Sequence, residues 1–360
     1  MLEKSGKQLP ILKTYIETKT LRKLADHLPL DTPFTVGIDP SNRCNFRCSF
    51  CPTGHKNLLR KIKRPIGIME YDLFKHIIDG MKGFPRKVKR LYLYHEGEPL
   101  LNPHLTDMLS YARKSDVSEM LQLTTNAALL TQEKADALLD ADIDLIRVSI
   151  EHVDDEGYKY LTGTKTTYET VRRNVAYLYE ARERRGSRLQ IHSKIMDTRL
   201  AEEQKEKFRH DFGPISDLLN IQYLGQMPSA EGVDFTLGTN PSMGSGGSPF
   251  QPLRQVCPHP FYVMVVKWRG EVVTCSEEWR WENIVGDVRM HTLPEIWNSE
   301  ALLQFRLTHL RGKRDEIPHC RHCPSVKGFP LENDLDEDAE RLRKIYECSK
   351  TIKEPLNVVK

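Results

Sequence analysis

Residues 39–54 read DPSNRCNFRCSFCPTG, which places Cys44, Cys48 and Cys51 within eight residues, directly after an apolar run. Thiolates at this spacing can converge on one metal centre. Zinc would need a fourth ligand, and His55 is close in sequence, whereas an iron–sulfur cluster can take three thiolates and leave one iron open. A position at the carboxyl end of a strand, where α/β folds place their chemistry, favours the cluster.

Outward from this stretch, apolar runs alternate with amphipathic segments from about residue 34 to residue 224. A repeat of this kind is typical of βα units and predicts a parallel sheet. The expected strands cover residues 34–38, 91–94, 121–125, 145–150, 189–196 and 218–224. The expected helices cover residues 70–82, 103–114, 131–140, 167–184 and 200–210.

Several of these strands carry polar residues on one face and apolar residues on the other. A doubly wound sheet, covered by helices on both faces, should be more uniformly apolar. The polar face therefore predicts a wide or incomplete barrel whose lumen binds something, with solvent-exposed strand ends as the alternative. The polar sets are Gln122, Thr124 and Asn126; Arg147, Ser149 and Glu151; and Gln190, His192 and Lys194.

Composition limits the class of protein. Hydrophobic residues at 39%, charged residues at 29% and a mean hydropathy of -0.52 predict a soluble globular chain of 360 residues. Neither a membrane span nor a secretory signal is evident, which predicts a cytoplasmic protein. The balance of 53 basic and 50 acidic residues predicts no nucleic-acid partner. In a reducing cytosol the eight cysteines indicate metal binding or catalysis.

A second cysteine group follows a stretch rich in proline, glycine and serine over residues 231–256, which predicts a flexible linker or lid. Four thiols with a closing C-x2-C pair make a complete ligand set for one metal centre, and a zinc ribbon is the alternative to an iron–sulfur cluster. Cys348 is then left over, either as an inert helix cysteine or as a hydrogen-atom donor. The four thiols belong to Cys257, Cys275, Cys320 and Cys323.

The spacing Cys44-x3-Cys48-x2-Cys51, with the aromatic Phe50 before the third cysteine, resembles the signature of radical S-adenosylmethionine (SAM) enzymes. The resemblance implies that the three cysteines hold a [4Fe-4S] cluster whose open iron binds SAM. Reductive cleavage of SAM then yields methionine and a 5′-deoxyadenosyl radical. It also implies a reducing flavodoxin or ferredoxin as the electron donor.

Other segments resemble the parts of this family that contact SAM. Gly97 and Glu98 match a Gly-Gly-Glu-Pro segment, in which Glu96 replaces the first glycine. Asn126 matches the Thr-Asn-Gly that ends strand three, and Ser149 matches the Ser-Leu-Asp of strand four. Read singly, each could be an ordinary turn or helix cap. Because these segments occur in the same order as in the family, each just past a predicted strand, the resemblance implies that they contact SAM.

The second cysteine group resembles the twitch domain, the shortened form of the SPASM auxiliary-cluster domain, with a spacing similar to that of 2-deoxy-scyllo-inosamine dehydrogenases. The resemblance implies a second [4Fe-4S] cluster and an α/β fold, a partial (β/α)6 TIM-like barrel with a small C-terminal α+β iron–sulfur domain. The expected division is a helical lead-in (1–33), the barrel (34–230), the linker (231–256), the cluster domain (257–330) and a C-terminal helix (331–360).

Two clusters imply oxidation of a small polar substrate, such as a sugar, cyclitol or nucleotide-linked sugar. A secondary alcohol would lose a hydrogen atom to the radical, a proton to a base and an electron to the auxiliary cluster, which yields a ketone. A base or cation must assist the proton loss, and the lumen candidates are Arg147, Glu151, His192 and Lys194.

Three other functions stay open. Return of a hydrogen atom from Cys348 would make an epimerase, and coupling of side chains would make a peptide maturase. Peptide-modifying relatives often carry a leader-recognition domain, for which the first 33 residues are too short. The alternative outside enzymes is a scaffold protein that binds zinc or a cluster.

Overall fold

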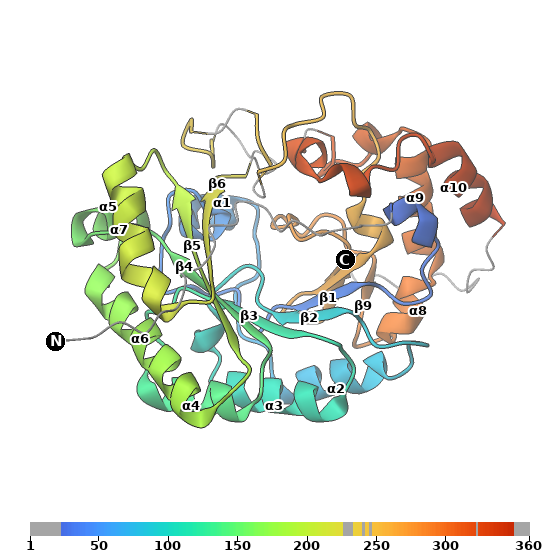
Figure 1. Cartoon of the computed structure of the whole chain (residues 1–360). Helices are drawn as coiled ribbons and strands as arrows, with labels where there is room; N and C mark the ends of the chain where they lie inside the picture. Colours follow the sequence, from blue (N-terminus) through green and yellow to red (C-terminus); the bar gives the residue numbers. More distant parts are fainter. Residues whose placement is uncertain (1–22, 226–232, 240–241, 245–246, 322, 349–360) are drawn as a thin grey trace.

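A computed structural model describes residues 23–225, 233–239, 242–244, 247–321 and 323–348. These residues build one nine-stranded sheet in the order β6-β5-β4-β3-β2-β1-β7-β8-β9 (Figure 1). From β6 to β1, neighbouring strands are all parallel, so the sheet curves as an open arc of βα units. The six predicted strands are confirmed as β1 (Thr35–Ile38), β2 (Arg90–Leu93), β3 (Leu121–Thr125), β4 (Leu145–Ile150), β5 (Gln190–Asp197) and β6 (Leu218–Tyr223).

Helices pack along the outside of this arc (Figure 1). The five predicted helices are confirmed as α2 (Tyr71–Met81), α3 (Leu105–Ser115), α4 (Gln132–Asp140), α6 (Tyr168–Arg185) and α7 (Glu202–Phe212). Two short helices were not predicted, α1 (Lys56–Lys61) and α5 (Asp155–Thr162). The second begins at an N-cap, since Asp154 accepts a hydrogen bond from the Gly157 amide at 2.7 Å.

The predicted alternation of faces is confirmed most clearly in β4. Ile146, Val148 and Ile150 are fully buried in the core beneath the helices. Arg147 and Ser149, which point to the opposite face, are half-buried. The inner face of the arc is therefore polar because the helices use only the apolar face of the sheet.

The C-terminal part of the chain extends the same sheet. A hairpin that turns at Arg269 and Gly270 joins the antiparallel strands β7 (Val263–Val266) and β8 (Glu271–Val273), and β9 (Gly286–Asp287) follows. The sequence did not predict that β7 pairs in parallel with β1, from Thr35 opposite Val263 to Ile38 opposite Val266. The hairpin is thus joined to the barrel by main-chain hydrogen bonds.

Three helices complete this half: α8 (Leu293–Trp297), α9 (Glu300–Leu310) and α10 (Ala339–Glu347). Tyr346 of α10 is buried, and its ring lies 5.6 Å from the ring of Phe261. The predicted C-terminal helix over 331–360 is shorter in the structure, since α10 begins only at Ala339, after a 3-10 turn at Leu331–Asn333, while residues 349–360 lie outside the described residues. Among the described helices, none is both long enough and apolar enough to cross a membrane.

The predicted lead-in and linker are described only in part. Residues 1–22 lie outside the described residues, and residues 24–27 form a 3-10 turn. Within the predicted linker, residues 231–232, 240–241 and 245–246 are likewise outside. Phe235 of this segment is buried, and its ring meets Trp279 edge to face at 5.8 Å. The described parts of the linker therefore pack against the rest of the protein.

The β1–β7 pairing predicts that the two halves unfold together. Met264 is fully buried in the main core, so Met264→Ala should lower the free energy of unfolding by about 2–5 kcal/mol. We expect Met264→Ala to unfold in one thermal transition, at a lower temperature than the wild type. Tyr160→Ala, at a side chain that is 83% exposed, is the control and should change stability little. A separate early transition of the C-terminal half would contradict the prediction.

Candidate functional site: two cysteine centres and the cavities between them

The first cysteine group lies in the loop after β1, at the carboxyl end of the parallel strands. The pKa of the Cys44 thiol rises to about 12, chiefly through burial and then, against a hydrogen bond from the Phe46 amide, through nearby Glu98 and Cys51. The pKa of Cys48 also rises, first through burial and then through Glu151 and the other two cysteines. The three sulfur atoms are therefore near enough to act on one another.

The second group gathers from separate parts of the C-terminal half. Cys257 precedes β7, Cys275 follows β8, and Cys320 and Cys323 lie beyond α9. Burial raises the pKa of Cys257 to about 12, with Cys323 as the next cause. Burial likewise raises the pKa of Cys275, followed by the charges of Cys257 and Cys323. A bound cationic centre would stabilise these neighbouring sulfur atoms in their thiolate form.

The spacing of the sulfurs fits a cluster better than a single ion. Among the described residues, the group with three ligand atoms within 4.8 Å of one another is Asp39, His95 and Glu96, and neither cysteine set forms such a group. Around one zinc ion with bonds of about 2.3 Å, sulfurs lie roughly 3.8 Å apart. Two sets of half-buried, wider-spaced thiols therefore suit iron–sulfur clusters.

A cavity of about 260 Å³ adjoins the first cysteine group. It brings together all five residues expected to contact SAM, together with Glu151 and Lys194. A methyl group at Gly97 would lie 2.3 Å from the carbonyl oxygens of Ser41 and Arg43, so only glycine fits there. The five expected residues are Phe50, Gly97, Glu98, Asn126 and Ser149.

Hydrogen bonds hold two of these residues in place. The Glu98 carboxylate accepts from the Thr125 hydroxyl at 2.7 Å and from the Asn126 amide N–H at 2.8 Å. The Asn126 side chain donates to Asn45, which lies beside Cys44. Ala127, where the family pattern has glycine, has a left-handed φ of 55°. Ala127 therefore keeps the left-handed backbone conformation that a glycine would adopt in this loop.

A larger cavity of about 520 Å³ opens next to the first and shares Phe50, Cys51 and Lys194 with it. Its walls come from both halves of the protein. The barrel contributes Arg147, Lys194, Met196, Gln222, Leu224 and Gly225. The C-terminal half and the segment before it contribute Gly244, Ser248, Phe250, Glu277, Ser325, Gly328, Phe329 and Pro330.

The predicted catalytic residues do not all line the same cavity. Arg147 and Lys194 line the larger cavity, Glu151 lines the smaller one, and His192 lines neither. Cys348 is exposed at the C-cap of α10 and also lines neither cavity. The structure therefore does not bring Cys348 to the site as a hydrogen donor.

Charged groups in the lumen have shifted pKa values. Burial raises the pKa of Glu151 to about 7, against the opposing charge of Lys194. Burial and then Arg147 lower the pKa of Lys194 to about 8, against Glu151. Both groups can therefore change charge near neutral pH.

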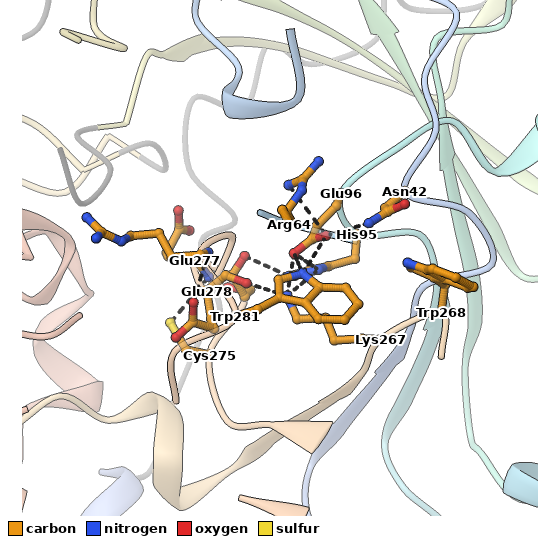
Figure 2. Close-up of polar contacts among 12 residues, drawn as sticks. Asn42, Arg64, His95, Glu96, Lys267, Trp268, Cys275, Glu277, Glu278 and Trp281 are labelled. Atoms are coloured by element: carbon orange, nitrogen blue, oxygen red, sulfur yellow. Dashed lines mark hydrogen bonds and ion pairs between the residues drawn. The ribbon is translucent and has the colours of Figure 1, made fainter. Parts of the chain in front are cut away.

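Glu277 is a site residue that the sequence analysis missed. It lies two residues after Cys275 and lines the larger cavity, and burial raises its pKa to about 7. Its nearness in sequence to a predicted metal ligand was the available signal. Figure 2 shows Glu277 beside Cys275, next to a buried group built around Glu96 and Lys267.

Two family models match the chain, one described as the radical SAM superfamily over residues 38–189 and one as an iron–sulfur cluster-binding SPASM domain over residues 257–324. The chain therefore belongs to the radical SAM enzymes and carries a SPASM domain. This confirms the predicted family and the predicted partial-barrel fold. The family implies a [4Fe-4S] cluster, SAM and additional iron–sulfur chemistry.

Curated relatives have several activities. A tungsten-containing aldehyde ferredoxin oxidoreductase cofactor-modifying protein of Pyrococcus furiosus is 26% identical over 79% of this chain and 86% of its own. A dTDP-4-amino-4,6-dideoxy-D-glucose ammonia-lyase of Streptomyces venezuelae is 28% identical over 51% and 40%. A probable GTP 3′,8-cyclase of Methanococcus maripaludis is 31% identical over 36% and 40%. The chain thus spans under half of the last two relatives.

Solved structures show the same fold. BtrN in complex with AdoMet and 2-DOIA matches with a TM-score of 0.52 at 18% identity, over 82% of this chain and 94% of that chain. The enzyme anSMEcpe with bound AdoMet matches at 0.54 and 14%, over 87% and 96%. Streptococcus suis SuiB bound to precursor peptide SuiA matches at 0.55 and 14%, over 79% and 69%. At these identities the likeness concerns the fold alone.

The two centres predict a simple pattern of iron loss. The wild-type protein, purified without oxygen, should hold about eight irons. Replacement of Cys44, Cys48 and Cys51 by alanine should remove about half of the iron and sulfide, and replacement of Cys320 and Cys323 should remove the other half. Cys348→Ala, at an exposed thiol, is the control and should remove none. About two zinc atoms and no iron would contradict the assignment.

A buried carboxyl near this site predicts a dependence of stability on pH. Asp39 is fully buried after β1, and burial and then Glu96 raise its pKa to about 7, against Lys267 and Arg64. Between about pH 4 and pH 7 the unfolded chain releases this proton while the folded chain keeps it. The unfolding free energy of the wild type should therefore fall as pH rises through this window.

Asp39→Asn removes this proton equilibrium. The stability of the variant relative to the wild type should therefore rise between about pH 4 and pH 7, by up to about 1.4 kcal/mol per pH unit. Thermal unfolding of both proteins at several pH values in this range measures the difference. If the stabilities of the two proteins changed with pH in parallel, the prediction that the pKa of Asp39 is raised would be wrong.

Proposed function

We propose that this chain is a radical SAM oxidoreductase that oxidises a secondary alcohol of a small polar substrate to a ketone. The observation that carries the proposal is the cavity of about 520 Å³. Its walls reach from Cys51 of the first cysteine group to Glu277, two residues from Cys275 of the second. A molecule in this cavity would lie between the two proposed clusters.

The residues around the first centre suit the cofactor that the family implies. We assign Cys44, Cys48 and Cys51 to the cluster that binds SAM, and Cys257, Cys275, Cys320 and Cys323 to the auxiliary cluster. When bound, these groups would supply a 5′-deoxyadenosyl radical on one side of the substrate and an electron acceptor on the other. A reducing flavodoxin or ferredoxin is the proposed electron donor.

Glu277 is the proposed base for the proton of the substrate hydroxyl. It faces the larger cavity, and a pKa near 7 suits a group that must accept a proton at neutral pH. Arg147 and Lys194 line the same cavity and would orient polar groups of the substrate. Glu151, in the smaller cavity, is better placed toward SAM. Phe250 and Phe329 would exclude water.

The cavity favours a sugar or cyclitol as the substrate class. Its lining combines cations, one carboxylate, the amide of Gln222 and the hydroxyls of Ser248 and Ser325 with apolar side chains. Such a wall can bind several hydroxyl or amino groups at once. The position of Cys348, on the surface and away from both cavities, opposes an epimerase that depends on this thiol.

A second candidate substrate class is the precursor of an organic cofactor. The Pyrococcus relative matches over most of both chains, and its name describes a cofactor-modifying protein. The same cavity and the same two centres would serve this reaction. Activity on cyclitols and aminosugars, compared with activity on cofactor precursors, distinguishes the two classes.

The reaction is tested with SAM, dithionite and candidate alcohols deuterated at the carbinol carbon. We expect deuterium in 5′-deoxyadenosine and one ketone for each 5′-deoxyadenosine formed. Retention of the hydroxyl with inverted configuration would establish an epimerase instead. Formation of 5′-deoxyadenosine without any ketone or transfer of deuterium, across all candidates, would contradict the alcohol oxidation.

The proposed base predicts a selective defect. Glu277→Gln should lower ketone formation about 100-fold or more, since a positioned base contributes about this factor, and should leave SAM cleavage without substrate unchanged. Glu282→Gln is the matched control, because Glu282 forms an ion pair with Arg280 in the same segment and lines neither cavity. Equal activity of the two variants would remove Glu277 as the base.

A further inference from the structure

A buried ionic group connects the barrel to the auxiliary half. At its centre is Glu96, which follows β2 and stands where the family pattern has glycine. Its carboxylate accepts a hydrogen bond from the Trp281 indole at 3.0 Å and one from the Asn42 side chain at 3.3 Å. It also pairs with the ammonium of Lys267 and lies 3.5 Å from the guanidinium of Arg64. Figure 2 shows these groups converging on Glu96.

The partners of Glu96 come from both halves of the site. Asn42 and Arg64 lie on either side of the first cysteine group. Lys267 follows β7, and Trp281 lies six residues after Cys275. One carboxylate thus contacts the segments that carry both cysteine groups.

Further contacts attach the same group to the loop of Cys275. The Lys267 ammonium also donates to the carbonyl oxygen of Glu278. His95, the neighbour of Glu96, forms a hydrogen bond through Nε2 to the carbonyl oxygen of Ser276 at 3.0 Å. The residue directly after Cys275 is therefore held by the residue directly before Glu96.

The charges in this group depend on one another. The side chains of Lys267 and Arg64 are fully buried, and the side chain of Glu96 is 3% exposed. Burial alone would raise the pKa of Glu96, but Lys267, Arg64 and His95 together hold it at about 2. Loss of Glu96 would leave two buried cations without their carboxylate.

The backbone supports a specific role for Trp281. Its φ of 61° lies in the left-handed region, which is unfavourable for a bulky side chain. In this conformation its indole N–H reaches both oxygens of Glu96, at 3.0 and 3.1 Å. Its ring also lies 5.6 Å from the Lys267 ammonium. The contacts to Glu96 and Lys267 thus accompany a strained backbone.

On the other side, Glu96 is directly bonded to the segment that we expect to bind SAM. Gly97 packs against Ser41 and Arg43, and the amide of Glu98 donates to the Arg43 carbonyl at 2.8 Å. The backbone of residues 96–98 is therefore fixed to the loop of the first cysteine group. The side chain of Glu96 is fixed to the loop of Cys275.

We propose that Glu96 and Lys267 are a positioning pair that sets the auxiliary cluster relative to the SAM-binding segment, and so sets the width of the substrate cavity between them. The inference rests on the proposed function in placing the substrate in this cavity. The pair acts through Gly97–Glu98 on one side and through the Cys275 loop on the other. Neither residue lines the larger cavity, so the pair would not touch the substrate there, although Glu96 lines the smaller cavity.

The same group does not require a metal ion. Asp39, His95 and Glu96 offer ligand atoms within 4.8 Å of one another. The Lys267 ammonium, however, already donates to Glu96, and its Nζ lies 3.5 Å from Nδ1 of His95. A cation is thus present at this point in the form of a side chain. A metal bound here, in place of the ammonium, would overturn the proposal.

The test uses the full chain with both clusters. Glu96→Gln and Lys267→Met should each keep about eight irons, and Lys267→Met, at a residue that lines neither cavity, should cleave SAM without substrate within about twofold of the wild type. Ketone formed per 5′-deoxyadenosine should fall about tenfold or more. Lys267→Arg, which keeps the charge, should retain more coupling than Lys267→Met. The control is Glu282→Gln, which removes a carboxylate from an ion pair on the same segment without touching the Glu96 group.

A second readout does not depend on the reaction. The auxiliary cluster is observed alone by EPR when Cys44, Cys48 and Cys51 are replaced by alanine. In this background Glu96→Gln, Lys267→Met and the milder Trp281→Phe should shift the spectrum of the reduced cluster, whereas Glu282→Gln should not. In the chain with both clusters, the double variant Glu96→Gln/Lys267→Met should recover part of the coupling that Glu96→Gln loses, because Arg64 is then the one buried cation of the pair left without its carboxylate.

The outcomes separate the two proposals. If the variants alter the EPR spectrum of the auxiliary cluster but the wild type forms no ketone, the proposed oxidation is contradicted. The positioning pair is then still supported. An unchanged spectrum with full coupling in all three variants would overturn the positioning pair alone. An equal loss of SAM cleavage and ketone in Lys267→Met, or an additional bound metal that disappears in Glu96→Gln, would also overturn it.

Discussion

The parallel pairing of β1 with β7 is the interaction on which the rest of the structure depends. It places the strand before Cys44 beside the strand that leads to Lys267 and Cys275. Because parallel neighbours end at the same edge of a sheet, Lys267 after β7 lies beside Asp39 after β1, between the segments that carry the two cysteine groups. The two cavities, which share three lining residues, occupy the space between them. Without this pairing, two cluster-binding segments would have no defined separation.

Burial controls the electrostatics of this region. Burial shifts the pKa of Cys257, Glu151 and Lys194 toward the neutral form of each group. Glu96 is the contrast, because two cations and a histidine keep it ionised. The site therefore combines groups that can exchange protons near neutral pH with a permanently charged group that holds the loops together.

The two departures from the family pattern have different physical meanings. Ala127 replaces a glycine and keeps its left-handed backbone, so the loop shape is preserved at some conformational cost. Glu96 replaces another glycine and introduces a carboxylate, which Lys267, Arg64 and Trp281 surround. The first change is a local matter of backbone conformation. The second is matched by residues far away in the chain, which indicates a function for the side chain.

The sequence by itself determined the βα order, the two cysteine groups and the lumen residues Arg147 and Lys194, because local periodicity and short spacings encode them. Short α5 escaped prediction, since its few residues carry little periodic signal. Only the tertiary structure joined β7 to β1, brought Glu277 into the cavity, excluded Cys348 from it and surrounded Glu96 with charge. Each of these depends on contacts between residues distant in the chain, which local patterns do not record.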